Sequence, residues 1–223
     1  MKSKKDLKIP FSWEERRPIY LERFFYLPKQ YDSHESFGRL DWSDPRIFGN
    51  GNPVRIELCS GNGQWIGERA KENPHINWVG VEIRFDRARK IWLKSFRENI
   101  PNLYTVCAEG KTFLRYYAPL KSVEQSYINF PDPWPKLRHA KHRIVQAPFL
   151  SCLSSVLKEG AIATFATDDA PYRDQMIREL LGWIPRFEAP HFRTDDEAYG
   201  DSYFRTLWKE RGRTIYHLEY QNG

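Results

Sequence analysis

The chain has 223 residues, with 35 Lys or Arg against 29 Asp or Glu, so its formal net charge is +6. Hydrophobic residues make up 40% and charged residues 29%, a balance typical of folded proteins that argues against disorder. No apolar run approaches the roughly 18–20 residues of a membrane span. Three widely spaced cysteines exclude a disulfide framework and a Cys-based zinc site, and indicate a reducing, cytoplasmic setting.

Residues 1–50 have weak periodicity and several prolines, which predicts an irregular N-terminal extension with at most one short helix. Up to residue 30 this extension carries eight Lys or Arg and four acids, so it is basic. A basic segment permits contact with nucleic acid without demonstrating it. The rest of the chain, residues 51–223, is expected to form one domain.

Apolar and amphipathic segments alternate through that domain. Strands are predicted at residues 54–60, 76–82, 103–107, 125–130 and 161–166, and helices at 64–72, 84–99, 111–117, 144–157 and 171–181. Gly160 is expected to end the helix of 144–157, and residues 187–192, 203–208 and 214–220 to form further strands. The alternation predicts a parallel, helix-flanked sheet, which binds ligands at the carboxyl ends of its strands.

A glycine-rich turn follows the first of these strands. Gly61 and Gly63 let the backbone turn tightly and approach a ligand at a helix N-terminus. The next glycine, Gly67, departs from the spacing of the dinucleotide-binding pattern. Glu82 ends the second strand about twenty residues on, where such folds place an acid against ribose hydroxyls of NAD or S-adenosylmethionine.

Acidic residues mark four successive strands: Glu57, Glu82, Glu109 and Asp132. Glu57 lies inside an apolar strand, where an unpaired carboxylate is costly. Its presence suggests a cationic partner, such as the amino group of a methionine moiety. An NAD-dependent oxidoreductase has no evident use for this residue, which disfavours that alternative.

The loop after the fourth strand carries the most specific pattern. Three prolines surround Asp132 and Trp134 and restrict the backbone that carries them. A tryptophan can stack on a base, and a carboxylate can accept hydrogen bonds from the N–H donors of guanine. Residues 136–143 add four basic side chains and two histidines without an acid. No further ligand set accompanies the histidines, so no metal is expected.

Three motifs resemble those of one known family. Residues 130–136, with Arg138, His139, Lys141 and Arg143, resemble the signature of the bacterial tRNA (guanine-N7)-methyltransferases. Residues 167–172 are similar to the Thr-Asp-x-x-x-Tyr of that family, and residues 206–212 to its C-terminal Thr-x-Phe-Glu-x-Arg-Gly. Order and spacing agree over roughly residues 53–220.

The resemblance implies an α/β, Rossmann-like class I methyltransferase with a mostly parallel seven-stranded sheet. It implies methyl transfer from S-adenosylmethionine to N7 of guanine 46 in the tRNA variable loop, by a monomer or homodimer without metal or membrane. By motif match, the cofactor-binding residues would be Glu57, Gly61, Gly63, Glu82, Glu109 and Asp132. Asp132 would also be catalytic, and Lys136, Asp168, Thr206 and Lys209 would contact tRNA.

Three positions depart from the family pattern: Cys59 replaces a glycine, Glu109 an aspartate and Lys209 a glutamate. Two rival functions remain open at this point. One is a base methyltransferase acting on an exocyclic amine, although its loop normally has an aromatic directly after two prolines. The other is a non-catalytic RNA-binding protein, against which the four acids speak.

Guanine N7 has an in-plane lone pair and no proton, so its methylation needs no general base. We expect Asp132 to orient guanine and to offset the positive charge that develops on the ring. The basic side chains of the same loop, Lys136, Arg138, Lys141 and Arg143, are expected to contact phosphates.

Overall fold

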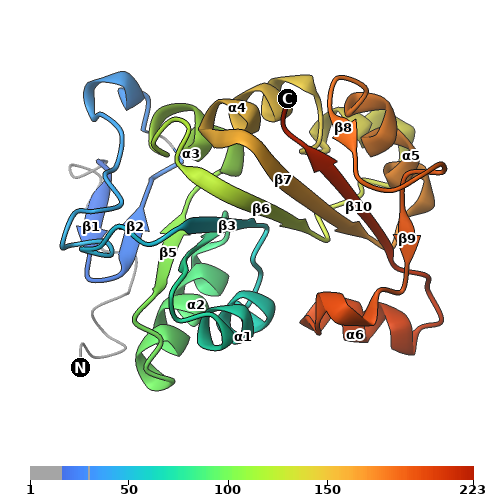
Figure 1. The fold of residues 1–223 in the computed structure, drawn as a ribbon. Coiled ribbons are helices and arrows are strands. Elements are labelled where there is room, and N and C mark those ends of the chain that lie inside the picture. Colours follow the sequence, from blue (N-terminus) through green and yellow to red (C-terminus); the bar gives the residue numbers. More distant parts are fainter. Residues whose placement is uncertain (1–16, 30) are drawn as a thin grey trace.

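The computed structural model describes residues 17–29 and 31–223. Within these residues one sheet has ten strands, in the order β1-β2-β5-β4-β3-β6-β7-β10-β8, with β9 paired to β10 (Figure 1). The helix-flanked, mostly parallel sheet confirms the predicted fold class. The strand number differs from the expected seven: β3 to β7 and β10 make six strands, and a short hairpin at one edge and two short strands at the other add four.

Five parallel strands form the centre of the sheet. They are β3 (Val54–Leu58), β4 (Asn77–Glu82), β5 (Leu103–Cys107), β6 (Val123–Asn129) and β7 (Leu157–Thr167). The chain runs outward from β3 to β5 and then crosses to β6 on the other side of β3. The order of strands therefore reverses between β3 and β6. In open α/β sheets the ligand crevice lies at this reversal, outside the carboxyl ends of the strands.

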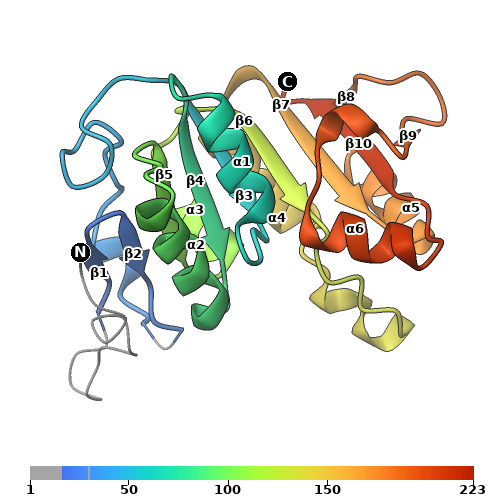
Figure 2. The same ribbon diagram turned by 90° about the horizontal axis from the view of Figure 1, so that it is seen from below.

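Helices cover both faces of the sheet. The helices α1 (Gln64–Glu72) and α2 (Phe85–Arg97) lie on one face, and α3 (Gly110–Tyr116), α4 (Ala147–Val156) and α5 (Ala170–Glu179) on the other (Figures 1 and 2). Helix α2 buries the apolar stripe expected from its periodicity, including Ile91 and Trp92. No helix in residues 17–29 and 31–223 has the length and apolar character needed to cross a membrane.

The C-terminal part differs from the prediction in two places. Residues 203–208 form no strand but belong to helix α6 (Tyr203–Glu210), whose first turn is capped because Ser202 Oγ accepts a hydrogen bond from Arg205 N at 3.1 Å. Residues 187–192 form no strand either; the short strands β8 (Ile184–Pro185) and β9 (Arg193–Thr194) lie on each side of them. Strand β10 (Tyr216–Gln221) is confirmed and pairs antiparallel with β7.

Gly160 also has a different place from the one expected. Helix α4 ends at Val156, and Gly160 lies inside β7 with a φ of +71°. The pairing of β6 with β7 shifts register between Val123 and Gln125 in this region. A glycine at positive φ therefore serves an irregularity in the strand rather than a helix end.

Residues 17–50 contain more regular structure than the irregular extension predicted from the sequence. Strands β1 (Ile19–Leu21) and β2 (Phe24–Tyr26) form a hairpin, and β2 pairs parallel with β5 at the edge of the sheet. Phe24 and Phe25 are fully buried, which explains why the hairpin stays there. The one short helix expected is the 3-10 turn η1 (His34–Ser36). The basic residues Lys2, Lys4, Lys5, Lys8 and Arg16 lie outside the described residues.

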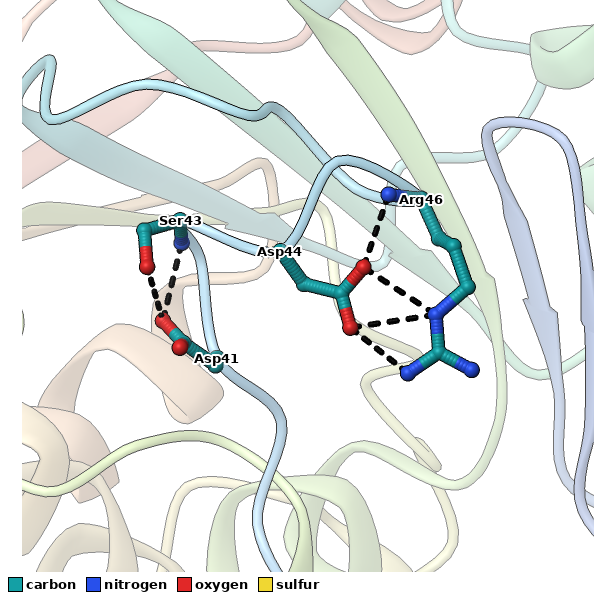
Figure 3. Close-up of polar contacts among 4 residues, drawn as sticks. All are labelled: Asp41, Ser43, Asp44 and Arg46. Atoms are coloured by element: carbon teal, nitrogen blue, oxygen red, sulfur yellow. Dashed lines mark hydrogen bonds and ion pairs between the residues drawn. The ribbon is translucent and has the colours of Figure 1, made fainter.

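A turn at residues 41–46 lies over this hairpin. Asp41 accepts hydrogen bonds from Ser43 N and Oγ at 2.9 and 2.7 Å, and Asp44 accepts from Arg46 N at 2.8 Å and from its guanidinium (Figure 3). These bonds lower the pKa of Asp44 to about 2. The Arg46 guanidinium also lies 4.8 Å from the ring centroid of Tyr20 on β1. The turn thereby connects the segment after the hairpin back to it.

Candidate active site

A cavity of about 410 Å³ opens at the carboxyl ends of β3, β4, β5 and β6. Its volume lies within the roughly 300–1,000 Å³ typical of small-molecule sites. The strand ends contribute a mixed wall of apolar and acidic side chains, which includes Leu58, Cys59, Val81, Glu82, Ala108, Glu109, Phe130, Pro131, Asp132 and Trp134. The structure thus brings three of the four predicted acids to one cavity.

Two of these acids are held by backbone N–H groups. Glu82, at the end of β4, accepts from Gly61 N at 2.9 Å and from Arg84 N at 2.8 Å. It is buried, and burial raises its pKa despite these bonds. Glu109 caps helix α3 by accepting from Lys111 N at 3.2 Å and Thr112 N at 2.6 Å. Both carboxylates are therefore fixed before any ligand binds.

Glu57, the fourth acid, lines a smaller cavity of about 20 Å³ next to the first. Its side chain is buried, and Oε1 accepts from Asn129 Nδ2 at 2.6 Å. Its Oε2 is also buried and has no hydrogen-bond partner among the described residues. Burial raises the pKa of Glu57 to about 7. An unpartnered buried carboxylate oxygen is costly, so this atom is a candidate for contact with a cationic ligand group.

The turn after β3 separates the two cavities. Cys59 lines both of them and has a φ of +63°, a conformation that glycine adopts with little cost. Gly61 lines the smaller cavity, and a Cβ there would lie 3.7 Å from Phe204. Gly63 lines neither; a Cβ on it would lie only 2.8 Å from Ile91 Cγ1 of α2. Gly63 thus allows helix α1 to approach α2, whereas Gly61 faces the site.

Asp132 lies on an irregular loop after β6. Phe130 and Trp134, on each side of it, both have positive φ, at 47° and 43°. The loop is clamped by Arg143, whose Nε donates to Pro133 O at 2.6 Å and whose Nη1 donates to Gln175 Oε1 at 2.6 Å. The exposed Asp132 carboxylate makes no hydrogen bond within the described part of the chain, so it is free to meet a ligand.

Arg143 differs from the expected phosphate contact. Its side chain is buried, with 7% exposure, and its guanidinium lies 4.9 Å from the ring centroid of Tyr172. The Arg143 guanidinium therefore stabilises the loop through buried contacts within the protein and is not available to bind phosphate. Lys136, Arg138 and Lys141 are exposed, as expected of phosphate-binding residues, although only Lys141 lines the cavity.

Aromatic rings gather at the mouth of the cavity beside Asp132. Trp134 is 38% exposed, and its ring centroid lies 5.1 Å from that of His142 and 5.8 Å from that of His139. Such an exposed tryptophan, held by its neighbours, offers a face on which a base can stack. Within residues 17–29 and 31–223, no group of three or more His, Cys, Asp or Glu residues is arranged to hold a metal ion.

The remaining predicted residues lie on the C-terminal side. The Asp168 side chain is buried and forms an ion pair with Arg213, whose guanidinium lies 4.1 Å from the ring centroid of Trp208. Thr206 and Lys209 are exposed on α6 and line neither cavity. Helix α6 reaches the site through Phe204, which lines both.

Sequence reasoning missed four residues of the site. Asn129 and Tyr199 contact the Glu57 side of the site, and Arg87 and Phe204 line the main cavity, where the Arg87 guanidinium lies 5.7 Å from the Phe204 ring centroid. Asn129 could have been found because it is a polar residue at the end of an apolar strand, immediately before the proline-rich loop. No local pattern distinguishes Tyr199 among twelve tyrosines.

Known proteins resemble this chain in sequence and in fold. The sequence model of a family described as "Putative methyltransferase" matches residues 51–218. The tRNA (guanine-N(7)-)-methyltransferase of Chlamydia felis is 44% identical over 216 residues, which cover 96% of this chain and 95% of that protein. The protein of the same name from Thermotoga maritima is 33% identical over 177 residues, or 79% of this chain and 56% of that protein.

Solved structures share the fold at low sequence identity. The 16S rRNA methyltransferase KamB has a TM-score of 0.58 at 18% identity and covers 83% of this chain and 94% of that one. A phosphoethanolamine N-methyltransferase of Haemonchus contortus, solved with S-adenosylhomocysteine, has a TM-score of 0.52 at 11% identity and covers 78% and 50%. The match to the Chlamydia felis protein extends over nearly the whole of both chains, and this chain belongs to the tRNA (guanine-N7)-methyltransferase family.

Proposed function

We propose that this protein transfers the methyl group of S-adenosylmethionine to N7 of a guanine in tRNA, at position 46 of the variable loop. The observation that carries the proposal is the meeting of Glu82, Glu109 and Asp132 at one cavity, with Glu57 directly beside it. These are the four acids that the family resemblance assigns to the cofactor. Names of the relatives supply the reaction and the substrate class.

The residues present fit S-adenosylmethionine. Glu57 Oε2 has no hydrogen-bond partner among the described residues and would accept from the amino group of the methionine moiety. Glu82, beyond the glycine turn, would accept from the ribose hydroxyls. Glu109 would accept from the adenine amino group while it continues to cap helix α3. Gly61 would allow close approach of the ligand, whereas Gly63 acts through the packing of α1 on α2.

When bound, the cofactor supplies a methyl group attached to a positively charged sulfur. The protein needs no general base, because N7 attacks with a lone pair already in the plane of the ring. The protein contributes by holding the two reactants in a partly closed site with N7, the methyl group and the sulfur in line. This alignment makes the transfer effectively unimolecular and so raises its rate. The histidines at the mouth, His139 and His142, are therefore not needed for proton transfer.

Asp132 is the catalytic residue of this proposal. Its carboxylate faces the cavity without a competing hydrogen bond from the described residues, and Arg143 holds the loop that carries it. There it would accept from the N–H donors of guanine and stabilise the positive charge that grows on the base. Trp134 would stack on the base beside it.

The tRNA would lie across the exposed part of the site. Lys136, Arg138 and Lys141 would contact its phosphates, and Thr206 and Lys209 on α6 would approach from the other side. Asp168 is already paired with Arg213, so its role would be to hold the segment after α6 in place or to exchange this partner for one on the tRNA.

We further propose that residues 51–223 form the methyltransferase domain, since the family match covers residues 51–218. The hairpin of residues 19–26 would then be an addition to the edge of its sheet. The protein would act in the cytoplasm, as a monomer or homodimer. Its three cysteines are free, which supports a reducing compartment.

The decisive experiment is methyl transfer from labelled cofactor to unmodified tRNA, followed by identification of the methylated nucleoside. We expect 7-methylguanosine, mapped to position 46, and no label in a transcript with that guanine replaced. Label in an exocyclic amino group would instead support the rival base methyltransferase. Binding of tRNA without any transfer would support a non-catalytic RNA-binding protein.

A further inference from the structure

A chain of two hydrogen bonds, partly buried at Tyr199 and buried at Glu57, leads from the C-terminal segment to Glu57. The Tyr199 hydroxyl donates to Asn129 Oδ1, and Asn129 Nδ2 donates to Glu57 Oε1 at 2.6 Å. A side-chain amide has one oxygen that accepts and one nitrogen that donates. Because Tyr199 takes the oxygen, the nitrogen of Asn129 is directed at the carboxylate.

Tyr199 is itself held by contacts with two residues, Trp65 and His217. Its ring stacks on that of Trp65 with a centroid distance of 5.2 Å and an interplanar angle of 22°. Trp65 Nε1 donates to the backbone oxygen of Tyr199 at 2.8 Å. The ring centroid of His217 on β10 lies 4.6 Å from that of Tyr199. The position of the hydroxyl is therefore determined by contacts that do not involve Asn129.

The two oxygens of Glu57 consequently have different environments. Oε1 is occupied by Asn129, and Oε2 is buried without a partner among the described residues, next to the small cavity lined by Gly61 and Ser60. If the carboxylate could rotate freely, its two oxygens would exchange positions. The hydrogen bond from Asn129 instead holds Oε1 in place, so that Oε2 remains available to a ligand.

We propose that Tyr199 is a positioning residue for cofactor binding, acting through Asn129 to hold the Glu57 carboxylate toward the amino group of S-adenosylmethionine. The inference rests on the proposed function, since it requires that Glu57 binds this cofactor. It adds a contribution from a segment more than 140 positions further along the chain, which no motif links to the cofactor.

Loss of the Tyr199 hydroxyl should act through the orientation of Asn129. Without that donor, the amide oxygen of Asn129 is left without this partner, and the amide is held less firmly beside Glu57. The amide and the carboxylate can then turn together, so that Oε2 is no longer held toward the ligand. Since one hydrogen bond of this kind is misplaced, we expect cofactor affinity to fall about tenfold.

The test uses the variant Tyr199→Phe, which keeps the ring and its stacking. Calorimetric titration with S-adenosylmethionine should give a Kd about tenfold higher than that of the unchanged protein. The KM for the cofactor should rise in parallel, while kcat and the KM for tRNA stay within about twofold. Tyr104→Phe is the matched control, because the Tyr104 hydroxyl is also buried but has no partner among the described residues; it should leave the Kd unchanged.

A double variant separates positioning from general packing. In a Glu57→Gln background, Tyr199→Phe should cause little further loss of affinity, because both changes act on the same contact. An equal tenfold loss in that background, or a single variant within twofold of the unchanged protein, would overturn the proposal. If Tyr199→Phe lowers the melting temperature markedly, Asn129→Ser replaces it in the same cycle.

The outcomes also separate this inference from the function on which it rests. If the unchanged protein does not bind the cofactor, or if Glu57→Gln binds it equally well, then the assignment of the site fails. If Glu57→Gln weakens binding and Tyr199→Phe does not, only the positioning role fails.

Discussion

The carboxyl edge of the sheet has two halves that differ in how their functional residues are held. On the β3–β5 side, Glu57, Glu82 and Glu109 are held by hydrogen bonds from Asn129 or from backbone N–H groups. On the other side, Asp132 and Lys136 are exposed on an irregular loop. The first half is prepared for a small ligand of fixed shape, and the second remains open to a large one.

This difference shows how one edge can serve two ligands of unequal size. Buried carboxylates carry an energetic cost that a cationic ligand group can relieve, so they select strongly by charge. Exposed basic side chains pay no such cost and act over a longer range, but their contacts weaken with salt. Asp132 is the exception, because it is an acid on the open side, and this position at the cavity fits its proposed role in catalysis.

The largest effect is expected where the two halves meet. Asp132→Ala should lower kcat by about 10²–10³-fold, because it removes the charge that stabilises the methylated base. The melting temperature should change little, since the carboxylate makes no hydrogen bond in the described residues. Much of the cofactor binding should remain, because Glu57, Glu82 and Glu109 are unchanged. Single-turnover kinetics and calorimetry measure these quantities, with Asp174→Ala on α5 as the control. Near-normal turnover would remove Asp132 from the mechanism.

On the β3–β5 side, the buried Glu57 carboxylate should make the stability of the protein depend on pH. Burial raises the pKa of Glu57 from 4.5 to about 7. Across this window the unfolded chain releases the proton while the folded chain keeps it, so stability falls as pH rises and levels off above about pH 7. The total corresponds to about 3 kcal/mol. Glu57→Gln should abolish this fall in the ligand-free protein and weaken cofactor binding at least tenfold.

Other buried groups also make stability depend on pH, so the effect of Glu57 must be measured as the difference between Glu57→Gln and the unchanged protein. Burial lowers the pKa of His217 to about 4, which makes stability rise with pH between about 4 and 6.5, and burial raises the pKa of Glu82. Both groups are present in the variant and in the unchanged protein. Urea unfolding at several pH values, with the two curves subtracted, isolates Glu57. A difference that does not grow between pH 4.5 and 7 would contradict its raised pKa.

The open half should respond to salt. Replacing Lys136, Arg138 and Lys141 together by Ala should reduce the slope of log K for tRNA against log salt by about 2, since each phosphate contact contributes roughly 0.7–0.9. Arg143→Lys should leave that slope unchanged, because Arg143 is buried and bonded to Pro133. It should lower kcat and the melting temperature instead. Equal slopes for the triple variant and the unchanged protein would show that these three side chains do not contact tRNA phosphates.

The smallest effect concerns Cys59, at the boundary between the two cavities. Cys59→Gly removes a side chain from a residue at positive φ, which relieves strain in the folded state but adds freedom to the unfolded one. The melting temperature should therefore change by no more than a few degrees, while cofactor affinity improves a few-fold. Asn99→Gly, also at positive φ, is the control and should leave affinity unchanged. Weaker binding by Cys59→Gly would assign the thiol a favourable contact.

Most of the central fold could be predicted from the sequence, because each buried parallel strand is a short apolar run. The strands predicted at residues 54–60 and 76–82 lie in the structure at Val54–Leu58 and Asn77–Glu82. Residues 203–208 are rich in aromatic residues, a composition that predicts a strand, although they belong to helix α6. Its helical start depends on the cap supplied by Ser202, a weak signal in one sequence.

The site was predictable to the extent that its residues follow strands. Glu82 and Asp132 meet because the carboxyl ends of neighbouring parallel strands share one edge. Arg143 could not be distinguished from Lys141 by its charge, since only the fold shows which of the two is buried. Tyr199 reaches Asn129 through the packing of a distant segment, and no spacing in the chain records that contact.

The hairpin of β1 and β2 has a consequence for handling the protein. It covers β5, whose unpaired backbone groups would otherwise form a parallel edge open to a second molecule. Removing residues 17–50 would also uncover the apolar surface on which Phe24 and Phe25 lie fully buried. We therefore expect a version trimmed to residues 51–223 to retain the whole cavity wall but to self-associate through the uncovered edge and apolar surface.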